Sequence, residues 1–165
     1  MYRVDDVVMY GVFGLCRVTA IEKRNFAGKA EDYYLLRPIK ADKSVYYVPM
    51  NNPVALSRIR PVCSKTEVDA LIARMHDTAL PWIENDGQRK EEFNRILKDA
   101  DKYEVMQLVK TLYLRRQALS EKGKKLRSSD EECLTLGENM LFEEFACALS
   151  IDRDAVVDYI RQRLQ

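Results

Sequence analysis

The segment 7–22 reads VVMYGVFGLCRVTAIE, and it places two β-type stretches on either side of a glycine-rich turn. Residues 7–10 are apolar with an aromatic end, and Gly11 and Gly14 bracket the turn. From Leu15 onward two sets of residues alternate along the chain, as they do in a half-buried strand. The segment therefore predicts two strands that are joined by a tight turn.

More β-rich stretches follow this pair. Residues 25–30 read NFAGKA, which is typical of a loop. Residues 32–38 and 45–49 are rich in tyrosine, leucine and valine, and each contains a closing proline. Several short strands at close spacing are typical of a small, strongly bent barrel of the Tudor or SH3 type.

The hydrophobic period becomes helical after residue 62. Ser64 and Glu67 form a capping-box pattern at the start of the first helix. Apolar residues then recur at the spacings i, i+3, i+4 and i+7 in three sets, which are Val68, Leu71, Ile72 and Met75, then Phe93, Ile96, Leu97 and Ala100, and finally Val105, Leu108, Val109 and Leu112. These sets predict three amphipathic helices.

Two further helices are expected beyond them. Asp101 is a plausible N-cap for the third helix, and Ser129 with Glu132 forms a second capping box before the fourth. Asp152 can cap a last short helix. We therefore predict an α+β protein with a Tudor/SH3-like β-barrel domain at residues 1–62 and an all-α bundle of about five helices at 63–165.

The composition excludes some classes of protein. The chain has 165 residues, of which 47% are hydrophobic and 32% are charged, as in a folded globular protein. Its net charge of +1 gives no global indication of nucleic acid or membrane as a partner. The apolar runs are too short to span a bilayer, and the acidic Asp5 and Asp6 do not suit a signal peptide. We expect a cytoplasmic protein with no membrane partner.

Charge is unevenly distributed, however. Residues 1–62 hold 10 Lys+Arg and 6 Asp+Glu, a net charge of +4, and residues 63–165 hold 17 and 20, a net charge of −3. Within the second part, residues 110–127 contain seven basic residues and one acidic residue. Such a cluster is either a solvated helix end or a phosphate-binding patch.

The sequence has no recognisable catalytic or metal-binding motif. Its four cysteines are scattered without a CxxC pair, and His76 is the only histidine. We expect buried, reduced thiols, no metal, no cofactor, no small-molecule substrate and no enzymatic activity. A catalytic pair of His76 and a distant cysteine is the one arrangement that sequence spacing leaves open.

Residues 4–14, VDDVVMYGVFG, resemble the "GD-V-VY-P-x-HG-x-G" theme of the CarD-like family of bacterial transcription regulators. That family shares its N-terminal domain with the transcription-repair coupling factor. The resemblance continues through YVPMNN at 47–52 and SRIRP at 57–61. In the second part, residues 89–101 and 126–146 are similar to two helices of the same family.

This resemblance implies a non-catalytic transcription regulator that modulates the stability of the open promoter complex. The N-terminal domain would bind the β subunit of RNA polymerase, and the implied contact residues are Arg24, Tyr47, Val48 and Pro49. The helical domain would contact promoter DNA without sequence specificity. The residues implied for that contact are Trp82, Arg89, Lys122, Lys124 and Lys125.

Two alternatives remain at this point. Trp82, which lies in a connecting stretch with Pro81, is either a wedge between DNA bases or a core residue that seals the junction of two helices. The function itself has a second interpretation, an RNA- or ribosome-associated module, because small barrels also bind single strands. Its aromatic platform would come from Tyr33, Tyr34, Tyr46 and Tyr47.

Overall fold

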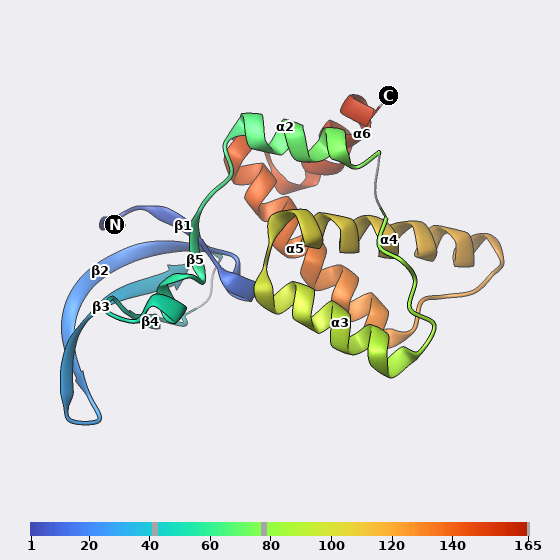
Figure 1. The fold of residues 1–165 in the computed structure, drawn as a ribbon. Helices are drawn as coiled ribbons and strands as arrows, with labels where there is room; N and C mark the ends of the chain where they lie inside the picture. Colours follow the sequence, from blue (N-terminus) through green and yellow to red (C-terminus); the bar gives the residue numbers. More distant parts are fainter. Residues whose placement is uncertain (41–42, 77–78, 165) are drawn as a thin grey trace. The chain divides into compact units, whose positions relative to one another are not determined.

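The computed structural model describes residues 1–40, 43–76 and 79–164. The chain forms two compact units, unit 1 (Met1–Val62) and unit 2 (Cys63–Gln165) (Figure 1). Each unit has its own cluster of buried apolar side chains. Within the described ranges, none of the helices has the length and apolar character that crossing a bilayer requires.

Unit 1 is an antiparallel five-stranded sheet. Its elements in chain order are β1 (Val7–Tyr10), the 3₁₀ turn η1 (Gly11–Phe13), β2 (Leu15–Phe26), β3 (Lys29–Pro38), β4 (Tyr46–Pro49), the short helix α1 (Pro53–Leu56) and β5 (Ile59–Pro61). The strand order is β4-β3-β2-β1-β5. Inward-facing residues of all five strands form the core, namely Val8, Cys16, Val18, Tyr34, Leu36, Val48 and Ile59.

The hairpin of β2 and β3 dominates this sheet and extends beyond its other strands (Figure 1). The two strands are joined by Ala27 and Gly28, which both have positive φ angles, of 53° and 80°. This pattern is the one that a two-residue type I′ turn requires, and its twist matches that of the flanking strands. A register shift between Val18 and Ala20 adds a bulge, which bends β2.

The predicted α+β class and the order of a β domain before a helical domain are confirmed, but the sheet is not closed into a barrel. β4 and β5 are the outer strands, and no pairing joins them among the residues that the structure describes. The alternation of side chains reveals strands, but it does not reveal whether the first and last strands of a sheet meet. The difference matters because the edge strands of an open sheet can pair with another chain.

Unit 2 is helical. It contains α2 (Lys65–Arg74), α3 (Asp86–Asp99), α4 (Lys102–Glu121), α5 (Ser128–Leu149), a 3₁₀ turn η2 (Arg153–Ala155) and α6 (Val156–Leu164). The long helix α5 packs against α2, α3, α4 and α6, so it forms the centre of the unit. Gly137 of α5 permits a close approach to α4, because a Cβ atom there would lie 2.9 Å from Cγ2 of Val109.

Two of the helix caps predicted from the sequence are observed. The Ser64 side chain accepts a hydrogen bond from the Glu67 amide (3.1 Å), and the Glu67 carboxylate accepts one from the Ser64 amide (2.8 Å), so the capping box is confirmed. Asp101 caps α4 as predicted. The box predicted at Ser129 is wrong, because α5 begins at Ser128 and has no side-chain cap.

The cysteines divide between core and surface. Cys16, Cys63 and Cys133 are buried, as expected, whereas Cys147 is exposed, which corrects the prediction for that residue. Burial raises the pKa of the Cys16 thiol to about 11. Across the described ranges, no cluster of three or more histidine, cysteine or acidic side chains could hold a metal ion.

Candidate functional site

One candidate site is the outer surface of unit 1 near β4. We call it the β4-edge surface and define it by Arg24 and Phe26 of β2, Tyr33 of β3 and Tyr47 of β4. The Phe26 ring makes edge contacts with the rings of Tyr33 and Tyr47, at centroid distances of 5.1 and 5.5 Å. The Arg24 guanidinium lies 5.8 Å from the centre of the Tyr47 ring. Strand pairing thus brings together residues that are distant in sequence.

Arg24 is free to exchange its partner. Its Nη2 lies 2.6 Å from Oε2 of Glu22, and both side chains are more than 40% exposed. Exposed ion pairs of this kind contribute at most about 1 kcal/mol, because water and salt screen them. A carboxylate on a binding partner can therefore compete for Arg24 at low cost.

The predicted contact residues of β4 differ in what they can offer. Tyr47 is 42% exposed and contributes its side chain to the surface, whereas Val48 is 1% exposed and packs in the core. Val48 therefore offers no side chain to a partner, and its position opposite Tyr34 places its main chain in the pairing with β3. Pro49 is half-buried and lacks an N–H group, which limits the hydrogen bonds that this end of the strand can donate.

Because β4 is an outer strand, its main chain can pair with an extended segment of another protein. The aromatic rings of Phe26 and Tyr47, which are 46% and 42% exposed, lie beside it. Backbone pairing would supply affinity at this edge, while aromatic and cationic side chains would supply specificity. The surface is therefore suited to binding a protein.

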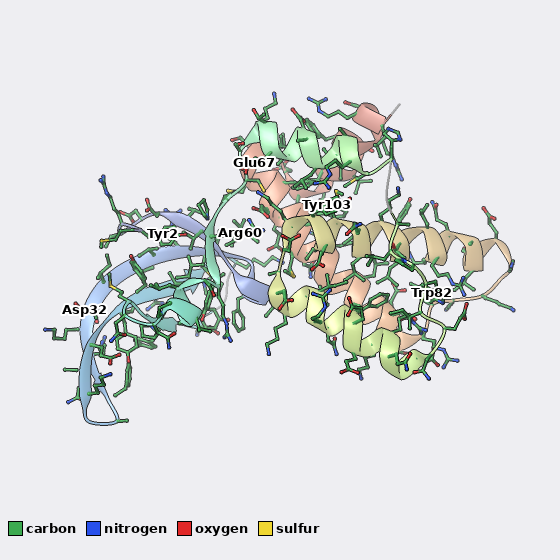
Figure 2. The ribbon with its side chains drawn as sticks, in the orientation of Figure 1. Tyr2, Asp32, Arg60, Glu67, Trp82 and Tyr103 are labelled. Carbon is green, nitrogen blue, oxygen red and sulfur yellow. The ribbon has the colours of Figure 1, made fainter. Side chains whose placement is uncertain are left out.

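A second candidate site lies in unit 2, where a cavity of about 420 Å³ opens beside Trp82. We call it the Trp82 hollow. Figure 2 shows Trp82 on the segment that connects α2 to α3. The hollow is lined by Trp82, Glu84, Asp86, Arg89, Arg115, Leu119, Lys124, Lys125, Leu126, Arg127 and Asp130. Of the predicted DNA-contact residues, it brings together Trp82, Arg89, Lys124 and Lys125.

Specific hydrogen bonds hold the connecting segment in place. The amide of Leu80 donates to Oγ1 of Thr111 on α4 (2.9 Å), and Nη1 of Arg89 donates to the carbonyl oxygen of Ile83 (3.0 Å). Trp82 lies between these two anchors. A segment without helix or strand is thus fixed to both α3 and α4.

Trp82 is half-buried, which is intermediate between the two predicted roles. Its ring makes an edge contact with the core residue Phe93, at a centroid distance of 6.3 Å. The guanidinium groups of Arg89 and Arg115 lie 4.6 and 4.5 Å from its ring centre. Trp82 therefore seals part of the core and also faces the hollow.

Arg89 has a structural role instead of a free cationic one. Its side chain is 3% exposed, and Nε and Nη2 donate to the two carboxylate oxygens of Asp130 at 3.0 and 2.8 Å. Asp86 accepts a further bond from Nη2 (2.8 Å). Hydrogen bonding to Asp130 raises the pKa of Arg89 above its ordinary value. We therefore do not include Arg89 among the proposed DNA contacts, because its guanidinium is already engaged.

The C-terminal end of α4 determines where Lys124 and Lys125 lie. Gly123, with φ of +69°, ends α4 in a Schellman motif, in which its amide donates to Ser120 (3.0 Å) and the Lys124 amide donates to Leu119 (2.8 Å). This turn directs the chain so that Lys124 and Lys125 line the hollow. Lys122 is exposed at the end of α4 but does not line it.

The hollow carries a net positive charge. Its lining includes five cations and three carboxylates, which gives +2. Since Arg89 and Asp130 pair with each other, the charge that faces solvent comes mainly from Arg115, Lys124 and Lys125, with Arg127 paired to Asp86 at 3.1 Å. Cations that are held beside an aromatic ring can bind an anion such as a phosphate group.

Three of these side chains, Phe26, Arg115 and Arg127, are not predicted as contacts from the sequence, whereas Tyr33 belongs to the aromatic platform of the alternative interpretation. Phe26 and Tyr33 join Arg24 and Tyr47 only through strand pairing, so no linear pattern connects them. Arg115 and Arg127 belong to the basic segment 110–127, and the density of positive charge in this segment is the feature of the sequence that indicates a phosphate-binding role for them.

An open sheet with an outer strand is a form that many protein-binding β domains have. Comparison with known families makes this class specific, because residues 2–62 match the family model described as the CarD-like/TRCF RID domain. Unit 1 is a CarD-like RNA polymerase-interacting domain, and the matched residues coincide with its compact fold. The resemblance drawn from the sequence is confirmed for this part of the chain.

Proposed function

We propose that this protein is a non-catalytic transcription regulator that binds the β subunit of RNA polymerase through the β4-edge surface and promoter DNA through the Trp82 hollow. In this way it modulates the stability of the open complex. The observation that carries the proposal is the combination of a CarD-like polymerase-interacting domain with an outer strand that is flanked by Arg24 and Tyr47.

The proposed DNA contact is weak and sequence-independent by itself. Arg115, Lys124 and Lys125 would bind phosphates, and Lys122 would add charge from the adjacent turn. The exposed part of Trp82 would approach the minor groove. Since polymerase holds the protein at the promoter, such a contact gains from a high effective concentration and needs no base-specific recognition.

The experiment that tests the polymerase contact compares two charge reversals in unit 1. Arg24→Glu is expected to weaken binding to the isolated β-subunit protrusion about tenfold at low salt, mainly through a slower association rate. Arg58→Glu makes the same charge change next to β5, at the opposite edge, and is expected to have little effect. Surface plasmon resonance at two salt concentrations measures both.

Unchanged affinity of Arg24→Glu would remove Arg24 from the interface. Equal losses for both variants would indicate a response to net charge and would contradict binding at β4. Because Tyr47 lies beside Arg24, Tyr47→Ala should weaken binding as well and should leave the salt dependence unchanged.

The second candidate, an RNA- or ribosome-associated module, is favoured by one observation. The exposed rings of Phe26 and Tyr47 form an aromatic cluster with the half-buried Tyr33 and have a cation beside them, and such clusters stack with unpaired bases. The platform is smaller than the sequence suggested, because Tyr34 is buried and Tyr46 packs against Tyr10 and Phe13. Capture of ribosomes in preference to polymerase from a cell extract would favour this alternative.

A further inference from the structure

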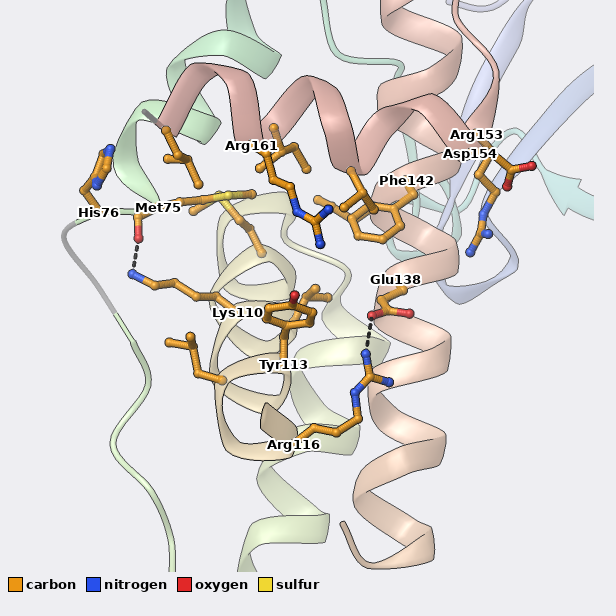
Figure 3. Close-up of a pocket in the computed structure, with 17 residues that line it drawn as sticks. Met75, His76, Lys110, Tyr113, Arg116, Glu138, Phe142, Arg153, Asp154 and Arg161 are labelled. Carbon is orange, nitrogen blue, oxygen red and sulfur yellow. Dashed lines mark hydrogen bonds and ion pairs between the residues drawn. The ribbon is translucent and has the colours of Figure 1, made fainter. Parts of the chain in front are cut away.

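A second cavity in unit 2 is not used by the proposed function. It is an apolar groove of about 630 Å³ between α4, α5 and α6, with the end of α2 at one side (Figure 3). Pockets of 300–1,000 Å³ with apolar walls and a few polar groups are typical of sites for small organic ligands. This groove has both properties.

Its walls are built by helical periodicity. α4 contributes Met106, Val109 and Tyr113, and α6 contributes Val157, Ile160 and Leu164, each at spacings of three or four residues. The opposite face of α6 is engaged elsewhere, since Tyr159 and Arg163 bind Asp69 of α2. One face of α6 thus holds the helix in place while the other remains available to a ligand.

Cations surround the apolar walls. The lining includes Lys110, Arg116, Arg153 and Arg161 against two carboxylates, those of Glu138 and Asp154, which gives a net charge of +2 if His76 is counted as neutral. Figure 3 shows the Arg161 side chain extending from α6 toward the ring of Tyr113. Such a rim complements an anion.

Two of these arginines are poorly neutralised by the protein. Arg153 donates to a neutral amide, Oδ1 of Asn139, at 2.6 Å, and its guanidinium lies 5.9 Å from the Phe142 ring. It interacts with the Glu138 carboxylate only through the longer-range charge attraction. Arg161 has a long ion pair of 3.7 Å with the exposed Asp158. In contrast, Arg116 is engaged by Glu131 and Glu138, and Lys110 donates to the carbonyl oxygen of Met75.

We propose that this groove binds a small amphipathic carboxylate, in which an apolar chain occupies the space between α4 and α6 and the carboxylate pairs with Arg153 and Arg161. A single negative charge fits better than a doubly charged phosphate, because Glu138 and Asp154 also line the groove and would repel the second charge. A guanidinium group binds a carboxylate in a bidentate manner, which fixes the position of the head group. The inference does not rest on the proposed function.

The test uses the full chain and decanoate as the probe, well below its micelle concentration. We expect saturable binding by isothermal titration calorimetry, with a dissociation constant on the order of 100 µM. In ¹³C-methyl NMR spectra, the shifts of Val109, Val157 and Ile160 should change. Decyltrimethylammonium tests the sign of the head group and acetate tests the need for the chain, and both are expected to bind at least about tenfold more weakly.

Matched variants localise the site. Arg153→Gln and Arg161→Gln are each expected to weaken decanoate binding about fivefold to tenfold, whereas Lys98→Gln, an exposed charge loss on α3, should leave it unchanged. Val157→Trp should fill the groove and abolish binding. Circular dichroism establishes that each variant is folded, and Arg153 and Arg161 are exposed, so their replacement leaves the core intact.

The proposal is supported if decanoate binds saturably, if its binding needs both the carboxylate and the apolar chain, and if the Arg153, Arg161 and Val157 variants weaken it. Equal binding of decanoate and decyltrimethylammonium, or undiminished binding to Val157→Trp, would overturn it. So would the absence of saturable decanoate binding. If an acidic amphipathic peptide shifted the same methyl groups while decanoate did not, the groove would belong to a partner helix instead.

Discussion

Trp82 connects the packing of unit 2 with its proposed DNA contact. Its ring meets Phe93 on the core side and the guanidinium groups of Arg89 and Arg115 at about equal distances. The side chain therefore belongs partly to the core and partly to the hollow. A residue in this position should show both a structural and a functional phenotype when it is replaced.

We predict that Trp82→Ala lowers the free energy of unfolding of unit 2 by about 1–3 kcal/mol, less than the loss for a fully buried tryptophan. It should also shorten the lifetime of the promoter open complex. Urea denaturation followed by circular dichroism measures the first effect, and decay of a competitor-challenged complex measures the second.

Trp82→Phe serves as the control for this variant, because it retains an aromatic face for Arg115. It should recover most of the stability. A lifetime that is normal in Trp82→Ala, alongside the expected loss of stability, would restrict Trp82 to the structural role.

Two of the predicted contact residues, Arg89 and Val48, are buried, and their burial depends on tertiary partners. Arg89 lies four residues before Phe93, on the core face of α3, and that spacing was the available sign of burial. What the spacing could not show was Asp130, which is distant in sequence and supplies the carboxylate. Val48 similarly occupies an inward position of β4, so its side chain packs in the core of unit 1.

At the level of elements, the contact of α4 with α5 depends on Gly137. An added Cβ atom would approach Cγ2 of Val109 to 2.9 Å, and Val109 is a β-branched residue with little rotamer freedom in a helix. We predict that Gly137→Ala lowers the free energy of unfolding by about 1–2 kcal/mol, although alanine is the better helix former. Urea denaturation monitored by the fluorescence of Trp82, the only tryptophan, measures this.

A double-mutant cycle tests the cause. Val109→Ala removes the atom that clashes, so it should cost less in the Gly137→Ala background than in the wild type, with a coupling of at least about 0.5 kcal/mol. Strictly additive effects would contradict the proposed contact.

The junction of α2 and α6 should respond to pH. Hydrogen bonds from Tyr159 (2.7 Å) and from Arg163 (2.8 Å) hold the pKa of Asp69 below its ordinary value of 3.8. A lowered pKa means that the folded state prefers the ionised carboxylate. The resulting stabilisation is therefore complete above about pH 5, and it is lost as the pH falls below 3.8 toward the lowered pKa.

Accordingly, Asp69→Asn should have a slightly lower melting temperature than the wild type at pH 7, and the difference should shrink between pH 4 and the acid limit of folding. Asp158→Asn, which removes an exposed carboxylate of α6, is expected to show a smaller difference at every pH. A difference between Asp69→Asn and the wild type that grew on acidification would contradict this assignment.

Helix starts show what local sequence can predict. The capping box of Ser64 and the cap of Asp101 involve residues within three positions, so their patterns are complete in the sequence. At α5 the same type of pattern failed, because the helix begins at Ser128, one residue before the predicted cap, and has no side-chain cap. Local patterns thus predict that a helix begins nearby, but they do not always fix the residue at which it begins.

At the scale of the whole molecule, the two units divide the proposed tasks. Unit 1 contains a complete core and coincides with the matched polymerase-interacting domain, so it should fold and bind independently. Unit 2 carries the Trp82 hollow, whose net charge of +2 is too small for strong binding to DNA alone. Covalent connection would compensate for this weakness, because it converts the second contact into an intramolecular one.

This division predicts the behaviour of separated parts. A fragment that ends at Cys63 should bind the β-subunit protrusion with an affinity within about twofold of the full chain. It should leave the lifetime of the open complex unchanged, because it lacks the hollow. Residues 63–165 alone should also have no effect at the same concentration, since they lack the contact that raises their effective concentration near DNA to the millimolar range.

The decay of promoter open complexes after addition of a competitor gives their lifetime in the presence of the full chain or of either fragment. Adding the two fragments together tests whether the covalent link is needed. If the N-terminal fragment stabilised open complexes as well as the full chain does, or if the unlinked pair did so, the bridging mechanism would be wrong.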